Sequence, residues 1–247
     1  MNSLITFLRD TPVWILALCI LAENVFILVA SVLVGQAIGK LYDSRRVTEE
    51  APPLTALEIG LAGVTILLNS LVTLGGLFLW RGGFIRFRVG FGWTVLLDFL
   101  VLVLLMDAAM YVLHRLAHIP LFFKVVHRTH HLYDNPRPLT LFVMNPVEAM
   151  SFGLLWLALL CVYDATWVGM ALYLAFNVAF GLLGHIGVEP FPERWKTTPI
   201  LKYISTSSFH AGHHRDGDHN FGFYTLIWDR IFGTLEPSHE KAVSMDR

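Results

Sequence analysis

The stretch VGFGWTVLLDFLVLVLLMDAAMYVL, residues 89–113, decides the fold class, because it is a long apolar run that ends directly at His114. A helix needs about 20 apolar residues to cross the hydrocarbon core of a bilayer, and this run exceeds that length. Its only acidic residues are Asp98 and Asp107. We therefore expect residues 89–113 to form a membrane-spanning helix.

Four other apolar runs have the length of a membrane helix or of one arm of a membrane hairpin. They are residues 12–35, 59–80, 146–163 and 165–184. Only Asp164 separates the last two, so we expect either two full spans or two shorter helices that enter the membrane and return. The first run is long and contains Glu23, so it should remain as an anchor instead of being cleaved as a signal peptide. The predicted fold is all-α, an integral membrane bundle of 4–5 transmembrane helices with a histidine-rich helical cap.

The composition agrees with a membrane protein and argues against other classes. Of the 247 residues, 55% are hydrophobic and 15% are charged, whereas soluble domains have about 45–50% apolar and about 25% charged residues. The net charge of −1 lacks the basic surplus of a nucleic-acid-binding protein. Cys19 and Cys161 both lie inside apolar runs, so no disulfide framework is indicated.

The basic residues predict an orientation in the membrane. If all five runs cross, the loop at residues 36–58, the polar stretch after residue 113 and the C-terminal tail share one face. Of the 18 Lys and Arg residues, only Arg9, Arg81, Arg86 and Arg88 lie on the opposite face. The positive-inside rule therefore places the shared face in the cytoplasm.

Eight of the 11 histidines occur in three short clusters. Side chains three and four residues apart project from one face of a helix, so each cluster should direct its rings toward one point. A single pair at this spacing is common by chance, but three such clusters indicate a metal site. The clusters are His114-X3-His118, His127-X2-His130-His131 and His210-X2-His213-His214.

The expected topology brings the clusters to one side of the bilayer. Between His131 and His210 the chain enters the membrane and comes back, and His185 follows the returning arm as a ninth candidate ligand. Nine imidazoles exceed what one ion can use, so we expect two ions. Imidazole suits iron, copper, zinc and nickel, which leaves the metal open. We expect His219 and His239 to be solvated side chains.

At these residues the chain resembles the fatty acid hydroxylase/sterol desaturase superfamily of membrane di-iron enzymes. The resemblance covers roughly residues 107–234. Many members have H-P-x-E after the second cluster, where this chain has Asn145-Pro146-Val147-Glu148. Besides the three clusters, the matching segments are Gly184-His185-Ile186-Gly187, Asn220-Phe221-Gly222 and WDRIFGT at residues 228–234.

The resemblance implies an O2-dependent enzyme that hydroxylates or desaturates a fatty acyl, sterol or related lipid at two iron ions, with zinc as a possible occupant after purification. We expect N-terminal membrane helices at residues 1–106, a catalytic domain resembling this superfamily at 107–236 that includes the hairpin 146–184, and a tail at 237–247. No fused cytochrome b5 domain is present, so electrons should come from a separate cytochrome b5-, ferredoxin- or reductase-type donor. The C-terminus has no dilysine signal, which favours a bacterial inner membrane over the endoplasmic reticulum.

Neutral histidine ligands also predict nearby carboxylates that orient their ring N–H groups. Asp107 lies seven residues before His114, two helical turns along the same face, and is the first candidate for the catalytic site. Glu148, Asp216 and Asp229 are the others.

Two other functions are also compatible with a histidine-rich membrane sequence. A membrane metal-binding or transport protein should place its ligands near the bilayer midplane. A haem electron carrier should place histidine pairs on facing spans. In this sequence the histidine clusters follow the predicted spans, which fits neither of these two arrangements.

Overall fold

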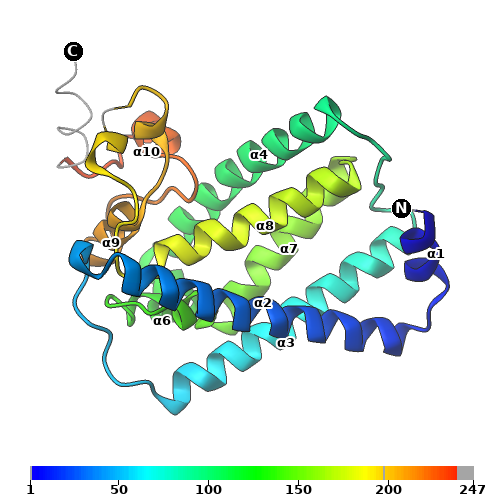
Figure 1. The fold of residues 1–247 in the computed structure, drawn as a ribbon, viewed down its shortest axis with the longest axis horizontal. Coiled ribbons are helices and arrows are strands. Elements are labelled where there is room, and N and C mark those ends of the chain that lie inside the picture. Colours follow the sequence, from blue (N-terminus) through cyan, green and yellow to red (C-terminus); the bar gives the residue numbers. More distant parts are fainter. Residues whose placement is uncertain (1, 197, 238–247) are drawn as a thin grey trace.

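The computed structural model describes residues 2–196 and 198–237, and this part of the chain is helical, with isolated β-bridges but no sheet (Figure 1). Five long helices form the bundle: α2 (Val13–Leu41), α3 (Ala56–Arg81), α4 (Trp93–Ala117), α7 (Pro146–Val162) and α8 (Trp167–Gly184). The shorter elements are α1 (Asn2–Asp10), η1 (Asp43–Arg45), α5 (Pro120–Phe122), η2 (Phe123–His127), α6 (Arg128–His131), η3 (Pro138–Phe142), η4 (Glu193–Lys196), η5 (Leu201–Tyr203), α9 (Ser207–Arg215) and α10 (Ile227–Phe232). Nearly all of the predicted tail, including His239, lies outside the described residues.

Four of the long helices, α2, α3, α4 and α8, are long and apolar enough to cross a membrane. Helix α7 is apolar but has 17 residues, which extend about 25 Å, somewhat less than the hydrocarbon core of about 30 Å. Large apolar side chains such as Phe26, Leu104 and Leu154 are exposed on the helix surfaces, where lipid would cover them. The predicted fold class, a helical membrane bundle with a histidine-rich region, is confirmed.

The helices begin and end at residues that hydropathy does not identify. Helix α2 continues to Leu41, six residues past the predicted end at Gly35, because polar residues extend a helix beyond the bilayer as readily as apolar ones. Helix α3 begins after Thr55, which forms a capping box with Glu58. Helix α4 begins at Trp93 and not at residue 89, since Gly92 adopts a φ of 64° that interrupts the helix.

The core lies between α4, α7 and α8, with α3 packed against α7 and α2 packed against α3 and α8. Leu102 and Met106 of α4 meet Leu159 of α7 and Tyr173 of α8 in one buried cluster. Tyr224, from the segment after α9, enters the same cluster. The segment after α9 is therefore packed against the core of the helical bundle.

Backbone hydrogen bonds join the loops at each end of the bundle. At one end, Val47 N–H donates to Gly187 O (3.0 Å), which ties the α2–α3 loop to the segment after α8. At the other end, Arg88 N–H donates to Ala165 O (2.8 Å), which ties the α3–α4 loop to the α7–α8 turn. The chain therefore alternates direction from one long helix to the next.

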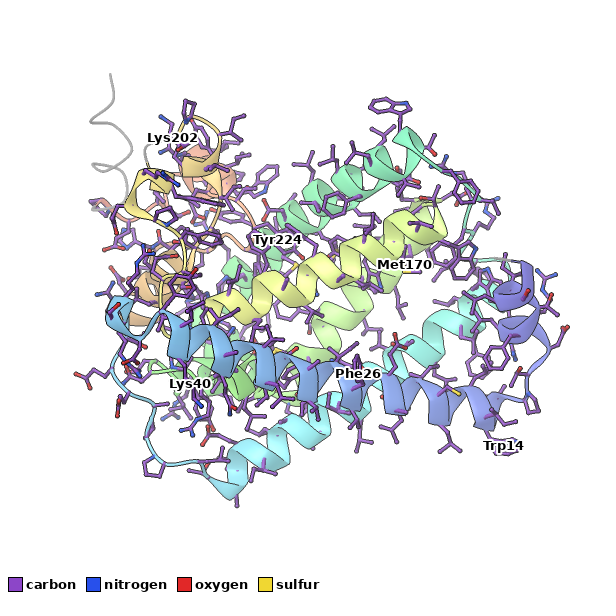
Figure 2. The ribbon with its side chains drawn as sticks, viewed as in Figure 1. Trp14, Phe26, Lys40, Met170, Lys202 and Tyr224 are labelled. Atoms are coloured by element: carbon purple, nitrogen blue, oxygen red, sulfur yellow. The ribbon has the colours of Figure 1, made fainter. Side chains whose placement is uncertain are left out.

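The histidine-bearing elements gather at one end of this bundle. Helices α6, α9 and α10 lie at the same end, while α1 lies at the opposite end (Figure 1). Lys40 marks the histidine end of α2, and Trp14 marks the other end (Figure 2).

Candidate metal centre

Nine histidines converge into two groups. In each group, one nitrogen from every ring lies within 4.8 Å of the corresponding nitrogens of the other rings. All nine are the residues predicted from the sequence. The five-histidine group is His114, His118, His127, His131 and His213, and the four-histidine group is His130, His185, His210 and His214.

Two of the sequence clusters are divided between the groups, so the expectation that each cluster points at one place is wrong for them. The pairs four residues apart stay together: His127 with His131 in one group, and His210 with His214 in the other. The residue between each pair, His130 or His213, belongs to the opposite group. Adjacent helical residues point about 100° apart, so His130 turns away from His131. The interleaved pattern thus supplies both groups from the same helices.

Hydrogen bonds leave the Nε2 lone pairs of three rings free for a metal. The Nδ1 atom of His114 lies 2.9 Å from Phe221 O, and that of His213 lies 2.7 Å from His219 O. A carbonyl oxygen only accepts, so each Nδ1 carries the hydrogen and each neutral ring has an unprotonated Nε2. His185 is held in the same way, by Gly181 O at 2.7 Å.

The Nε2 atoms face one another at distances that suit a shared cation. His114 Nε2 lies 3.0 Å from His127 Nε2, and His131 Nε2 lies 3.1 Å from His213 Nε2. Two nitrogens bound to one ion at about 2.0–2.1 Å are this far apart when the angle at the metal is roughly 90–100°. In the four-histidine group, His214 Nε2 lies 3.1 Å from His130 Nε2. These distances fit a metal with more than four ligands better than a closed tetrahedral site.

An unpartnered nitrogen in the second group also indicates a cation. His185 Nε2 is buried and has no hydrogen-bond partner among the described residues. A buried polar atom without a partner is costly, and a metal ion would use this lone pair. The residues present therefore fit two metal ions, one in each group.

Burial keeps the rings neutral at physiological pH. Burial, helped by the nearby His131 ring, lowers the pKa of His118 to about 4. Burial and the neighbouring His131 and His118 rings lower the pKa of His127 to about 2. Burial also lowers the pKa of His210 well below its usual value. Only neutral imidazole binds a metal, so these rings are ready to do so at pH 7.

Of the predicted carboxylates, Glu148 contacts a ring of the five-histidine group. Its Oε1 lies 2.6 Å from His127 Nδ1, and both side chains are buried. Asn145 places Glu148 by capping α7, since its side chain accepts from Val147 N–H at 2.9 Å. Pro146 occupies the first turn, where no N–H is needed. The carboxylate is therefore positioned to fix the His127 ring.

Asp229 acts on the histidines through a backbone turn. Its carboxylate accepts from the N–H groups of Phe221 and Gly222, each at 2.8 Å. Burial raises the pKa of Asp229 to about 6, although these hydrogen bonds oppose the change. Because the carbonyl of Phe221 accepts from His114 Nδ1, the Asp229 carboxylate fixes the peptide that orients this ring.

Asp107 is fully buried but contacts none of the nine rings in the described part of the chain. It accepts from Tyr224 N–H (2.8 Å), the Thr225 hydroxyl (2.5 Å) and the Trp228 indole N–H (3.1 Å). Tyr224 and Thr225 belong to the segment between α9 and α10, and Trp228 lies in the first turn of α10. Asp107 thus satisfies non-helical backbone inside the bundle, which an apolar environment requires, and its predicted contact with a ring N–H is absent.

The backbone carbonyls that orient the rings could not be predicted from the sequence, because any residue supplies a carbonyl. The one local signal is Asn220, whose φ of 60° lies in the left-handed region that asparagine tolerates. It turns the chain so that the carbonyls on both sides, His219 O and Phe221 O, accept from two rings of the five-histidine group. The side chain of His219 belongs to neither group and instead contacts the exposed Asp216.

Comparison with known proteins identifies the family of the segment that holds these histidines. The fatty acid hydroxylase family model matches residues 99–234. A very-long-chain aldehyde decarbonylase, GL1-1, from Oryza sativa is 35% identical over 132 residues, which cover 51% of this chain and 21% of the rice protein. Lathosterol oxidase of Mus musculus is 29% identical over 53% of this chain and 42% of its own length. A Delta(7)-sterol 5(6)-desaturase of Leptosphaeria maculans is 24% identical over 55% and 36%, respectively.

The chain thus aligns with about a fifth to two fifths of these curated relatives. No solved structure matches it. The family model covers more than half of the chain and spans the segments that hold all nine histidines, so the chain belongs to the fatty acid hydroxylase family.

Proposed function

We propose that this protein is a multi-pass membrane oxidoreductase that uses O2 to hydroxylate or desaturate an unactivated C–H bond of a fatty acyl, sterol or related lipid. The observation that carries the proposal is the convergence of nine neutral histidines into two groups at one end of a membrane bundle. The names of the sterol desaturase and lathosterol oxidase relatives support a lipid substrate.

We assign one iron ion to each histidine group. Iron supplies the redox chemistry needed to activate O2 and to remove hydrogen from a C–H bond. The protein holds the ligand nitrogens neutral and at fixed distances, and Glu148 holds His127 by its Nδ1. Zinc binds such nitrogen ligands more tightly than Fe(II), so zinc in a purified sample does not contradict this assignment.

The remaining requirements follow from the reaction. Hydroxylation inserts one oxygen atom of O2 into the C–H bond and releases the other as water, which consumes two electrons and two protons. We propose that a separate cytochrome b5-, ferredoxin- or reductase-type donor supplies the electrons. On the positive-inside rule this donor is cytoplasmic, because the histidine end has most of the basic residues.

A metal-binding or transport protein is the alternative function. A transporter needs ligands near the bilayer midplane, whereas here the histidines lie at the ends of α4 and α8 and in the segments that follow. The ring arrangement therefore favours the oxidoreductase.

Lipid analysis under labelled oxygen tests the proposal. Cells with and without the protein are grown under 18O2 together with a redox donor, and their lipids are compared by mass spectrometry. Hydroxylation adds one labelled oxygen atom, and desaturation removes two hydrogen atoms without adding label. His131→Ala should abolish either change, while His239→Ala, outside the three clusters, serves as the control. A change in cellular metal content without any lipid change would instead support the transport function.

A further inference from the structure

The amide of Asn177 is held differently from that of Asn24, the asparagine of α2. Asn24 donates to Ile20 O of its own helix at 2.9 Å, so this hydrogen bond stays within one helix. Asn177, in the middle of α8, is half-buried, and its Oδ1 accepts from the Tyr224 hydroxyl at 2.5 Å. Polar groups within a membrane span are costly and are usually retained for a function. The hydrogen bond from Tyr224 thus holds Asn177 through a residue of another segment of the chain.

Tyr173, Tyr224 and Asn177 form a hydrogen-bonded cluster in the described part of the chain. The hydrogen bonds of this cluster leave one end of the Asn177 amide without a partner. The Tyr224 hydroxyl has one hydrogen, which it donates to Asn177, so the Tyr173 hydroxyl 2.9 Å away donates to Tyr224. In the part of the chain that the structure describes, the Asn177 amide has no second hydrogen-bond partner. Exchanging the oxygen and nitrogen of the amide does not alter this count, because one of the two atoms is still unpaired.

The cluster is connected to the metal centre along two routes. Tyr224 follows Phe221 by three residues, and Phe221 O orients His114. Asn177 lies seven residues before Gly184, the last residue of α8, about 10 Å along the helix axis, and His185 of the four-histidine group follows at once. Tyr224 lies between α4 and α8 (Figure 2). The Asn177 amide thus lies farther toward the membrane interior than the histidines.

The surroundings of the amide select a neutral partner. Tyr224 packs edge-on against Phe176 and Phe180 of α8, with ring centroids 5.0 and 5.6 Å away. Its hydroxyl also lies 3.7 Å from the Met110 sulfur. The phenols, amide and thioether of this cluster have no charge, so an anionic head group would find no counter-ion among them. An uncharged hydroxyl or carbonyl group would pair with the amide.

We propose that Asn177 is a positioning residue that anchors an uncharged hydroxyl or carbonyl group of the lipid substrate, and so decides which carbon reaches the metals. This inference rests on the proposed lipid oxidation and names the class of lipid. A chain without such a group would slide along an apolar path, whereas one fixed hydrogen bond sets its register.

Binding of matched lipid pairs tests the anchor without relying on turnover. Tritiated 5α-cholestan-3β-ol and 5α-cholestane form one pair, and octadecan-1-ol and octadecane form the other, each measured by scintillation proximity on purified protein in detergent. We expect the wild type to bind the alcohol of at least one pair about five- to tenfold more tightly than its hydrocarbon. Asn177→Leu should remove this preference. Asn69→Leu, which changes a half-buried asparagine of α3, should keep it.

The result that overturns the anchor is an equal affinity for alcohol and hydrocarbon in the wild type, or a preference that survives in Asn177→Leu. The comparison of alcohol and hydrocarbon affinity in the wild type remains a valid test even if Asn177→Leu does not fold. Tyr173→Phe leaves the Tyr224–Asn177 bond in place and should keep the preference, and loss of the preference in this variant alone would assign the anchor to the phenol instead. Alcohol selection that depends on Asn177, found without any lipid product, would contradict the proposed reaction but not the anchor.

Discussion

The five-histidine group and the four-histidine group draw on the same helices, α6 and α9, but their rings are held differently. In the first group, His114 and His213 donate to backbone carbonyls and His127 pairs with Glu148. In the second group, the Nδ1 atom of His214 is buried without a hydrogen-bond partner among the described residues. External hydrogen bonds fix the tautomer and the orientation of a ligand ring. The comparison indicates that the five-histidine group is the more pre-organised site.

The largest expected effect is the loss of one ion from a variant that lacks a central ligand. His131→Ala removes a ring whose Nε2 lies about 3 Å from those of both His118 and His213, so the five-histidine group should lose its metal and activity should fall to background. His210→Ala should do the same to the other group. Metal analysis by mass spectrometry should show about half the wild-type content in each variant. Loss of both ions from either variant would show that the two groups do not bind their ions independently.

The next effect tests the orienting carboxylate. Glu148→Ala removes the partner of His127 Nδ1, and loss of such a partner typically weakens metal binding about 10–100-fold. Competition with a chromogenic chelator measures the affinity of each ion. Glu189→Gln is the control, because Glu189 is buried at the same end but accepts from Ser208. A reduced affinity at the four-histidine group alone would mean that the carboxylate does not act through His127.

Chelation of the wild type compares the two groups directly. The four-histidine group has fewer ligands and fewer external hydrogen bonds, so a chelator should remove its ion first, with an affinity difference of about tenfold or more. Release is followed by titration with the chelator and metal analysis of the retained protein. A single release step for both ions would show that the hydrogen-bond difference does not affect binding.

The smallest expected effect concerns Asn220, which shapes the turn beside the five-histidine group. Asn220→Ala keeps a β-carbon at a φ of 60° and removes the side-chain amide, which accepts from Glu236 N–H and donates to Phe209 O. Asn220→Gly removes the same amide but leaves no β-carbon at this φ. We expect the alanine variant to be the less stable by about 1 kcal/mol, measured as a difference in thermal unfolding midpoint. Equal midpoints for the two variants would show that the turn relaxes to another conformation.

The parts of this structure that could be predicted depend on residue type, and the rest depends on tertiary contacts. Apolar runs predicted all five long helices because burial in lipid requires apolar side chains along the whole span. The helix ends departed from the runs at Gly92 and Leu41, where backbone conformation and helix continuation decide. The nine histidines were identified by type and spacing. The division of the nine rings into two groups was not predicted, since it depends on the directions in which the adjacent side chains of His130 and His131 point.

The same distinction explains the carboxylates. Glu148, Asp107, Asp216 and Asp229 were chosen because acids near histidines often orient rings. Glu148 contacts a ring of the five-histidine group directly, whereas Asp216 contacts His219, which belongs to neither group. The sequence holds no sign that Asp107 and Asp229 bind backbone N–H groups of the segment between α9 and α10, because any residue presents an N–H.

The hydrogen bond between His114 and Phe221 joins residues that are 107 positions apart, and this separation has a consequence for biosynthesis. During translation, the first two histidine clusters leave the ribosome long before the turn that orients them. The α7–α8 hairpin must also insert before that turn can dock. The nascent chain therefore passes through a period in which its membrane helices are in place but the two histidine groups are incomplete, so metal ions held by these groups would be inserted at the last stage of assembly.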